Sequence, residues 1–292
     1  MAVLGNGSAN GACSLLHAAG LGYGASLALD LQVTVRVLDK QPRKVLEDPD
    51  GLLNEVETSW KNAGHDFPDQ EIFWSVTSDI PPRQGLKSSS AVAVAAIRAL
   101  CDATETELSN GEIVDIAAAA QLASGVSITG SYDDSWASIE GGWKLIDISA
   151  ETAEQGLLLE SPGPNSEDWT VLIVLRDERL ERPSLESFSY QQQSFSQALT
   201  ALQEGKDLVA LTLNGRGVIG AVNDPIARRM TNDAFVNGAR AAGMTGSGPA
   251  IVIFLPSISQ QSIDRLRNWY DRYDGVEILE TTVINADLVY EQ

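Results

Sequence analysis

The chain has 292 residues, of which 40 are acidic and 20 basic, so it carries a formal net charge of −20. So few cations cannot assemble a basic face, which excludes nucleic acid as a partner. Hydrophobic residues make up 43% of the chain and the mean hydropathy is −0.06, as in a globular protein. No apolar run approaches the length of a membrane span and no secretory signal opens the sequence, so we expect neither a membrane anchor nor export.

The acidic residues are dispersed along the chain rather than collected in a tail. Of the 20 basic residues, 6 are lysine and 14 arginine, and adaptation to high salt would produce such a lysine-poor, acidic surface. An ordinary acidic enzyme is the alternative. The two cysteines, Cys13 and Cys101, stand among small or apolar residues without disulfide or metal spacing, which indicates buried thiols in the cytoplasm.

Residues 1–30 contain six glycines among small residues. This density predicts tight turns and close approach of the backbone, either to a substrate or to a packed neighbouring strand. Residues 32–38 alternate valine with polar residues, which predicts a half-buried strand. Asp30 precedes that strand and is either a substrate contact or a turn residue at the strand end.

A helix over 51–62 and a strand over 71–76 are expected to lead into the segment 81–100. After two prolines, this segment passes through Gly85-Leu86-Lys87-Ser88-Ser89-Ser90 into an alanine-rich helix, for which serine is a preferred N-cap. A glycine-containing loop before a helix offers unpaired N–H groups and the positive end of the helix dipole, which favours phosphate. Lys87 adds a charge, and the hydroxyls could bind phosphate oxygens or Mg²⁺. A serine-capped core helix is the alternative.

Residues 112–124 predict a second helix with apolar residues on one face. The pair Asp133-Asp134 follows it and precedes Gly141-Gly142. This pair is either a turn that satisfies its own backbone or a place where a carboxylate accepts the proton of a hydroxyl group. After a strand over 144–148, residues 151–168 shift to acids, glycine, proline and serine, which predicts a crossing between two domains.

The second half of the chain alternates short apolar runs with helical patterns. A helix is expected to begin at Asp224-Pro225 and to run towards Gly243. A second glycine-rich loop, Thr245-Gly246-Ser247-Gly248, follows this helix and precedes a strand. The other expected elements are buried or half-buried strands over 169–175, 251–255, 276–279 and 281–286 and helices over 191–204 and 262–273.

Three regions resemble the signatures of the GHMP kinase superfamily. The segment from Pro81 resembles the second signature, P-x-x-x-G-L-x-S-S-A, with Ser90 where most members carry alanine. Its Gly-Leu-Lys-Ser-Ser-Ser-Ala form and the pattern of residues 11–31 resemble the archaeal shikimate kinase branch. Thr245 to Gly248 resembles the third signature, T-G-x-G, and the spacing from Asp134 to Gly141-Gly142 resembles that after the catalytic aspartate of the mevalonate kinase subgroup.

The resemblance covers nearly the whole chain and implies an α+β fold of two domains. The N-terminal kinase domain, similar to ribosomal protein S5, would span 1–155 and hold the phosphate loop 81–91. A ferredoxin-like C-terminal domain would span 165–292. ATP and Mg²⁺ would bind between the two domains.

The same resemblance implies transfer of the γ-phosphoryl group of ATP to a hydroxyl of shikimate. Asp134 would act as the catalytic base or hydroxyl positioner, Ser89 and Asp133 as magnesium ligands, and Asp30 and Arg83 as substrate contacts. The residues implied to bind the nucleotide are Gly85, Leu86, Lys87, Ser88, Ser89, Ser90, Gly246, Ser247 and Gly248.

The sequence departs from the superfamily pattern in two places. No lysine precedes Lys40, although mevalonate kinase has one in its first signature, and residues 117–124 contain no acid where a glutamate metal ligand would stand. A carboxylate substrate also requires an arginine partner, and the candidates are Arg83, Arg216, Arg228 and Arg229. A homoserine or other small-alcohol kinase, or a non-catalytic nucleotide-binding regulator, is the alternative; the oligomeric state is not indicated.

Overall fold

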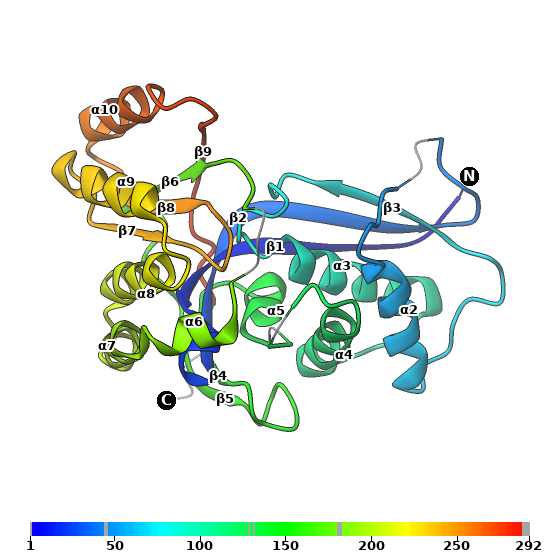
Figure 1. Cartoon of the computed structure of the whole chain (residues 1–292). Helices are drawn as coiled ribbons and strands as arrows, with labels where there is room; N and C mark the ends of the chain where they lie inside the picture. The colour runs from blue at the N-terminus through cyan, green and yellow to red at the C-terminus, as the bar shows by residue number, and fades with distance from the viewer. Residues whose placement is uncertain (1, 44–45, 128, 131, 180–182, 288–292) are drawn as a thin grey trace.

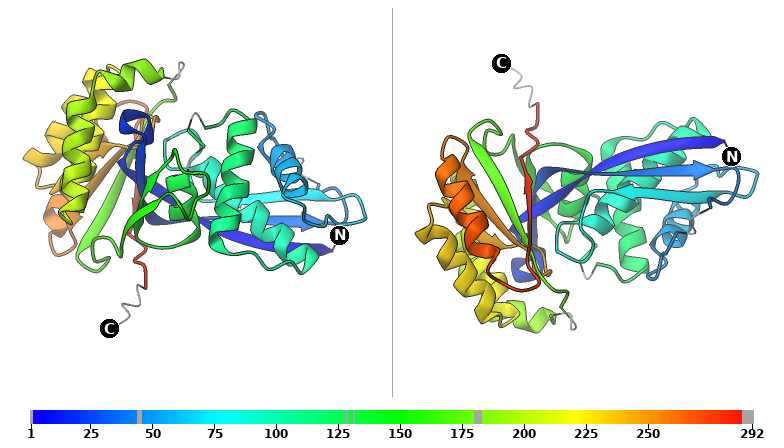
Figure 2. Two further views of the ribbon diagram at one scale, coloured as in Figure 1. Left: turned by 90° about the horizontal axis from the view of Figure 1, so that it is seen from below. Right: turned by 90° about the horizontal axis from the view of Figure 1, so that it is seen from above.

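The computed structural model describes residues 2–43, 46–127, 129–130, 132–179 and 183–287 as two antiparallel sheets that lie side by side, each with helices packed against it (Figures 1 and 2). The outer ends of the two predicted domains, residue 1 and residues 288–292, fall outside the described residues. Within the described part, no helix has the length and apolar character required to cross a membrane.

The first sheet is built around one long strand, β2 (Tyr23–Leu38). Residues 25–38 of β2 pair with β1 (Val3–Leu16) on one side, while its two ends pair with β3 (Phe73–Ser78) and β4 (Trp143–Asp147) on the other. Strand β5 (Leu157–Ser161) pairs with β4, so part of the predicted crossing belongs to this sheet. The predicted turns of residues 1–30 are therefore wrong in large part, because most of these residues form a long hairpin with the short helix α1 (Ala18–Leu21) at its end.

Glycines in β1 allow a helix to lie directly on the strand. A Cβ atom added at Gly7 would lie 2.1 Å from the carbonyl oxygen of Ala95, and one at Gly5 would lie 2.1 Å from that of Ala99. Both alanines belong to α3 (Ser88–Thr104). The glycine density at the start of the chain thus serves close packing of backbone on backbone. The other helices of this half are α2 (Leu52–Asn62), α4 (Asn110–Ala123) and α5 (Tyr132–Ile139).

The second sheet has the strand order β7-β8-β6-β9. In chain order from β6 this is 2-3-1-4, the order of a ferredoxin-like β-α-β-β-α-β unit, so the predicted fold of this half is confirmed. The helices lie outside the sheet, on the left in Figure 1. The strands are β6 (Trp169–Leu175), β7 (Ala241–Met244), β8 (Ile251–Pro256) and β9 (Glu277–Thr281), and the helices are α6 (Leu185–Ser189), α7 (Gln192–Gln203), α8 (Asp207–Ala221), α9 (Pro225–Val236) and α10 (Gln260–Tyr270).

The segment after β9 returns to the first sheet, as the red trace in Figure 2 shows. The N–H of Ile284 donates to the carbonyl of Ala28 at 3.1 Å, and the N–H of Gly142 donates to the carbonyl of Ile284 at 2.7 Å. A Cβ atom added at Gly141 would lie 2.4 Å from the carbonyl oxygen of Asn285. The strand predicted over 281–286 is therefore mostly this crossing, which explains why two glycines follow α5.

Candidate active site

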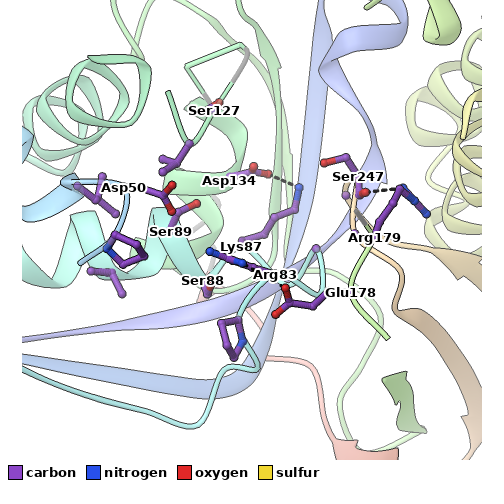
Figure 3. Close-up of a pocket in the computed structure, with 18 of the residues that line it drawn as sticks. Asp50, Arg83, Lys87, Ser88, Ser89, Ser127, Asp134, Glu178, Arg179 and Ser247 are labelled. Atoms are coloured by element: carbon purple, nitrogen blue, oxygen red, sulfur yellow. Dashed lines mark hydrogen bonds and ion pairs between the residues drawn. The ribbon is translucent and has the colours of Figure 1, made fainter. Parts of the chain in front are cut away.

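A cavity of about 630 Å³ lies where the start of α3, the first turn of α5 and the second glycine-rich loop meet. Figure 3 shows Lys87 and Asp134 facing each other in the middle of this cavity, with Asp50 on one side and Arg179 and Ser247 on the other. Among the residues that line it are Asp48, Asp50, Arg83, Lys87, Ser88, Ser89, Asp133, Asp134, Glu178, Arg179 and Ser247.

The helix that follows the phosphate loop begins without a side-chain cap. Lys87, with φ of 64°, is the N-cap residue, and its side chain makes no capping hydrogen bond. The serine N-cap expected from the sequence is wrong, because Ser88 is already helical. The first hydrogen bond of the helix runs from the N–H of Ala91 to the carbonyl of Lys87 at 3.0 Å. The preceding N–H groups have no intrahelical acceptor, which suits an anionic ligand.

The two glycine-rich loops lie in direct contact. A Cβ atom added at Gly85 would lie 2.1 Å from the carbonyl oxygen of Thr245, and one at Gly248 would lie 2.2 Å from the carbonyl carbon of Gln84. The Thr245 hydroxyl donates to the carbonyl of Gly85 at 3.1 Å. Only residues without a side chain allow this approach, so the loop 245–248 forms one wall of the cavity beside the phosphate loop.

Lys87 and Asp134 form a largely buried ion pair. The Lys87 Nζ atom lies 2.7 Å from Asp134 Oδ1, and the two side chains are 9% and 14% exposed. The Ser26 hydroxyl donates to Asp134 Oδ1 at 2.7 Å and lies 3.2 Å from Asp133 Oδ2. The lysine that the sequence suggested for phosphate binding thus also holds the aspartate, and it does so from the second signature region rather than the first.

The two neighbouring aspartates have opposite pKa shifts. Burial and the negative charge of Asp134 raise the pKa of Asp133 to about 8. Burial acts against ionisation of Asp134 as well, but Lys87 and the hydrogen bond from Ser26 outweigh it and lower the pKa of Asp134. At neutral pH the site therefore holds one neutral carboxyl group and one carboxylate, and the carboxylate is the one that touches Lys87.

His17 lines the cavity in a defined tautomer, and nothing in the sequence analysis singled it out. Its Nδ1 atom accepts a hydrogen bond from the N–H of Ala19 at 3.2 Å. Burial and the positive charge of Lys87 lower its pKa to about 4. The ring is therefore neutral at pH 7 and carries its proton on Nε2, which makes it a hydrogen-bond donor at the cavity wall.

Arg179 is a second cavity residue that sequence reasoning missed. Its guanidinium donates to the carbonyl of Ser247 at 2.7 Å and lies 3.8 Å from Asp224. Arg176 already pairs with both oxygens of Asp224, at 2.9 and 3.3 Å. Arg179 is thus held in place while much of its hydrogen-bonding capacity remains available to a ligand.

Several predicted site residues do not face the cavity. Asp30 is exposed, does not line the cavity and makes backbone hydrogen bonds with residues 281–282, so it is a strand residue rather than a substrate contact. Leu86 and Ser90 are buried behind the cavity wall. Three of the four candidate arginines, Arg216, Arg228 and Arg229, also lie elsewhere, whereas Arg83 is at the rim and pairs with Glu178 at 3.2 Å.

The oxygen atoms that line the cavity suit a metal ion whose ligands come mostly from the substrate and from water. Within the described residues, no cluster of three or more His, Cys, Asp or Glu side chains could hold a metal ion. The hydroxyls of Ser88 and Ser89 and the carboxylate of Asp134 line the cavity near the start of α3. Mg²⁺ commonly binds through one or two protein oxygens together with phosphate oxygens and water, so these residues fit a nucleotide-bound Mg²⁺.

Comparison with known families agrees with this arrangement. Residues 53–142, which include the phosphate loop and Asp134, match the model of the GHMP kinases N terminal domain. The chain thus contains a GHMP kinase N-terminal domain. Two curated relatives of the chain are the shikimate kinases of Methanocella arvoryzae, 29% identical over 96% of this chain and 94% of the relative, and of Methanothermobacter thermautotrophicus, 28% identical over 94% of each chain.

Solved structures of small-molecule kinases share the fold along nearly the whole chain. The mevalonate kinase of Methanococcus jannaschii superposes with a TM-score of 0.72 at 15% identity, over 96% of this chain and 98% of the other. A putative homoserine kinase from Listeria monocytogenes superposes with a TM-score of 0.64 at 21% identity, over 96% of each chain. The two-sheet fold is therefore shared with these two kinases.

Proposed function

We propose that this chain transfers the γ-phosphoryl group of ATP to a hydroxyl group of shikimate. The observation that carries the proposal is the Lys87–Asp134 ion pair, 2.7 Å across, beside the uncapped start of α3. A kinase of small alcohols needs a helix start that can bind phosphate and, beside it, a carboxylate that can orient the attacking hydroxyl group. The choice of shikimate rests on the curated relatives, which carry the name shikimate kinase over nearly the full chain.

The nucleotide is proposed to span the cavity from α2 to the start of α3. Apolar side chains on the α2 side would cover the adenine ring, namely Leu46, Leu52, Leu53, Val76, Val92 and Val126. The N–H groups of Ser88 and Ser89 would bind the phosphate oxygens, together with the backbone of the loop 246–248. The cavity volume of about 630 Å³ is in the range of small-molecule sites.

Asp134 is proposed to align the attacking hydroxyl group. The lowered pKa of Asp134 makes its carboxylate a weak base, so removal of the hydroxyl proton before the phosphoryl transfer would be unfavourable. Phosphoryl transfer has a loose transition state in which the hydroxyl loses its proton late. Asp134 therefore accepts a hydrogen bond from the hydroxyl first and its proton as the new oxygen–phosphorus bond forms, while Lys87 fixes the carboxylate and offers a positive charge to the phosphoryl group.

Ser89 remains our proposed magnesium ligand, with the carboxylate of Asp134 on the same cavity wall. Asp133 suits this role poorly, because its carboxyl group is buried against Gly24 and Ser26 and is neutral at pH 7. A bound Mg²⁺ would shield the negative charge of the phosphates during the transfer.

Arg179 is proposed to bind the carboxylate of the acceptor. It is 20% exposed and held against the loop that carries Ser247, whereas Arg83 is 61% exposed and already pairs with Glu178. A planar guanidinium can bind a carboxylate through two parallel hydrogen bonds. The Nε2–H group of neutral His17 would then donate to a ring hydroxyl of the acceptor.

The composition supports two further proposals about the setting of the enzyme. The two cysteines, Cys13 and Cys101, form no disulfide, so we propose that the chain works in the cytoplasm, where thiols stay reduced. The excess of acidic residues, 40 against 20 basic ones, supports adaptation to molar salt.

A screen of ADP release in molar KCl tests the proposed function. Shikimate, homoserine, mevalonate and galactose are offered separately with ATP and Mg²⁺, and the product is identified by ³¹P NMR. We expect shikimate to give the highest kcat/KM by at least a hundredfold and to yield a single phosphate monoester. A higher kcat/KM with homoserine would assign the enzyme to the homoserine kinases, and no turnover with any acceptor would contradict a kinase.

A further inference from the structure

A chain of buried hydrogen bonds links the two helices that carry the ion pair. The Ser90 hydroxyl donates to Gln121 Oε1 at 2.6 Å, and Gln121 Nε2 donates to the Ser135 hydroxyl oxygen at 3.0 Å. The three side chains are no more than 1% exposed, and none of them lines the cavity. Because Ser90 belongs to α3, Gln121 to α4 and Ser135 to α5, this bridge joins all three helices.

The bridge lies directly behind the reacting groups. Ser90 follows Lys87 by three residues in the first turn of α3, and Ser135 follows Asp134 in the first turn of α5. Any shift of α5 relative to α3 therefore changes the distance between Lys87 and Asp134. A displacement of about 1 Å in a catalytic group can cost about a hundredfold in rate.

The amide of Gln121 is well suited to a fixed geometry. Its second N–H donates to the carbonyl of Ala117 in its own helix at 3.2 Å, so both amide hydrogens and the oxygen are used. A fully used buried amide has one favourable orientation, since any rotation leaves a polar atom without a partner. Glutamate at this position would bury a carboxylate and could not donate to Ser135.

Helix α5 needs such a connection because it is short. It has eight residues, and a helix of this length is not stable without tertiary contacts. Hydrophobic packing of Trp136 and Ile139 buries α5 but is not directional. The bridge to Ser135 supplies a directional contact on the side of α5 that faces α4.

We propose that Gln121 is a positioning residue that sets the placement of Asp134 relative to Lys87 through Ser90 and Ser135. The bridge acts on the transfer step and not on binding, because none of its three side chains lines the cavity. The kinetic test of this inference rests on the proposed function. Its prediction that α5 is less firmly held without the bridge rests on the structure alone.

The test compares Gln121→Met, Ser135→Ala and the double variant with the wild type, using the acceptor that the wild type phosphorylates. Methionine is similar in length to glutamine but makes no such hydrogen bonds. We expect kcat to fall at least tenfold in each single variant while KM for ATP and for the acceptor stays within twofold. The double variant should have the kcat of the single ones, since one bridge is broken in all three.

Asn237→Leu is the matched control. Asn237 is also a buried amide that donates to a carbonyl of its own helix, at 2.8 Å, but it ends α9 and does not line the cavity. The Asn237→Leu substitution should lower the melting temperature without lowering kcat. Hydrogen exchange provides a readout that needs no activity: residues 132–139 should exchange faster in Gln121→Met and at the wild-type rate in Asn237→Leu.

Two results would overturn the inference. One is a kcat within twofold of wild type in Ser135→Ala, which decides the matter even if Gln121→Met does not fold. The other is unchanged exchange of residues 132–139 in a folded Gln121→Met variant, which decides it even if the wild type phosphorylates no acceptor. An inactive wild type with faster exchange in the variant would contradict the proposed function alone.

Discussion

At the scale of single residues, the site separates charges that the sequence places together. Asp133 and Asp134 are adjacent in the chain, yet one is neutral and the other ionised because only Asp134 touches Lys87. Arg176 and Arg179 show a similar division, since Arg176 neutralises Asp224 and Arg179 faces the cavity. In both pairs, one member maintains the structure and the other is available for chemistry.

Arg179→Lys should raise KM for the acceptor about tenfold or more while KM for ATP changes less than threefold. Lysine keeps the charge but loses the planar fork that binds a carboxylate at two points, and a tenfold change corresponds to about 1.4 kcal/mol. Steady-state kinetics with each substrate varied in turn measure both constants. Arg229→Lys, at an exposed position outside the cavity, is the control. A rise confined to KM for ATP would assign Arg179 to the nucleotide.

The buried carboxyl group of Asp133 should make stability depend on pH. Its pKa is raised in the folded state, from 3.8 to about 8, so the native protein holds a proton that the unfolded chain releases above pH 4. Its contribution to stability is therefore fully present below about pH 4 and is lost as the pH rises towards 8. An asparagine at position 133 cannot ionise, so the Asp133→Asn variant should not lose this stability as the pH rises.

The melting temperature of Asp133→Asn, relative to that of the wild type, should accordingly increase between pH 5 and pH 8.5. Differential scanning calorimetry across that range measures the difference. A constant difference would mean that Asp133 is ionised in the native protein at neutral pH.

At the scale of elements, the position of α3 depends on glycines in another element. Gly7→Ala should destabilise the protein by about 1–3 kcal/mol, the usual cost of overpacking, because the new methyl group would meet the carbonyl oxygen of Ala95. Urea unfolding measures this change.

Gly220→Ala, in α8, is the matched glycine control. The new methyl group there meets the end of the flexible Gln191 side chain, and alanine is the better helix former, so this variant should be neutral or stabilising. Equal destabilisation in the two variants would contradict the packing account.

The sequence predicted the elements whose signals are local. The strand over 169–175 coincides with β6, and the helix over 51–62 differs from α2 by one residue. Strand β1 was missed because Gly5 and Gly7 weaken the strand pattern, and they are explained only by the helix that lies on them. Helix α5 was not predicted, since a helix of eight residues is stabilised by its neighbours rather than by its own sequence.

The candidate site was predictable where a signature covers it, as at the phosphate loop and Asp134. The helix predicted from Asp224 ends at Val236, and β7 occupies 241–244 instead. Arg179 has no local signal, because it meets the cavity only where the segment after β6 lies beside Ser247, and Ser247 is 68 residues from Arg179 in the chain. Nothing in the sequence pairs residues at that separation.

At the scale of the whole molecule, about twenty uncompensated negative charges share one folded surface. The Debye length grows from ~3 Å at 1 M salt to ~10 Å at 0.1 M, so repulsion then extends across whole faces. Native stability is typically only ~5–15 kcal/mol. We therefore expect the melting temperature and the activity to rise together from 0.1 M to 2 M KCl, with NaCl giving a similar gain.

Circular dichroism and the ADP-release assay at matched salt concentrations check this expectation. A melting temperature that does not change over the range would rule out adaptation to high salt and would leave the kinase assignment intact.

The central claim is that Asp134, held by Lys87, aligns a hydroxyl group for phosphoryl transfer. Single-turnover rapid quench with excess enzyme and γ-labelled ATP tests it most directly, with calorimetric titration of ATP and shikimate on the same variants. Asp134→Asn should bind both ligands within about threefold of wild type and transfer at least about a hundredfold more slowly, whereas Asp133→Asn should transfer at nearly the wild-type rate, because asparagine resembles a neutral carboxyl group. Transfer by Asp134→Asn at the wild-type rate, or a larger loss in Asp133→Asn, would contradict the account.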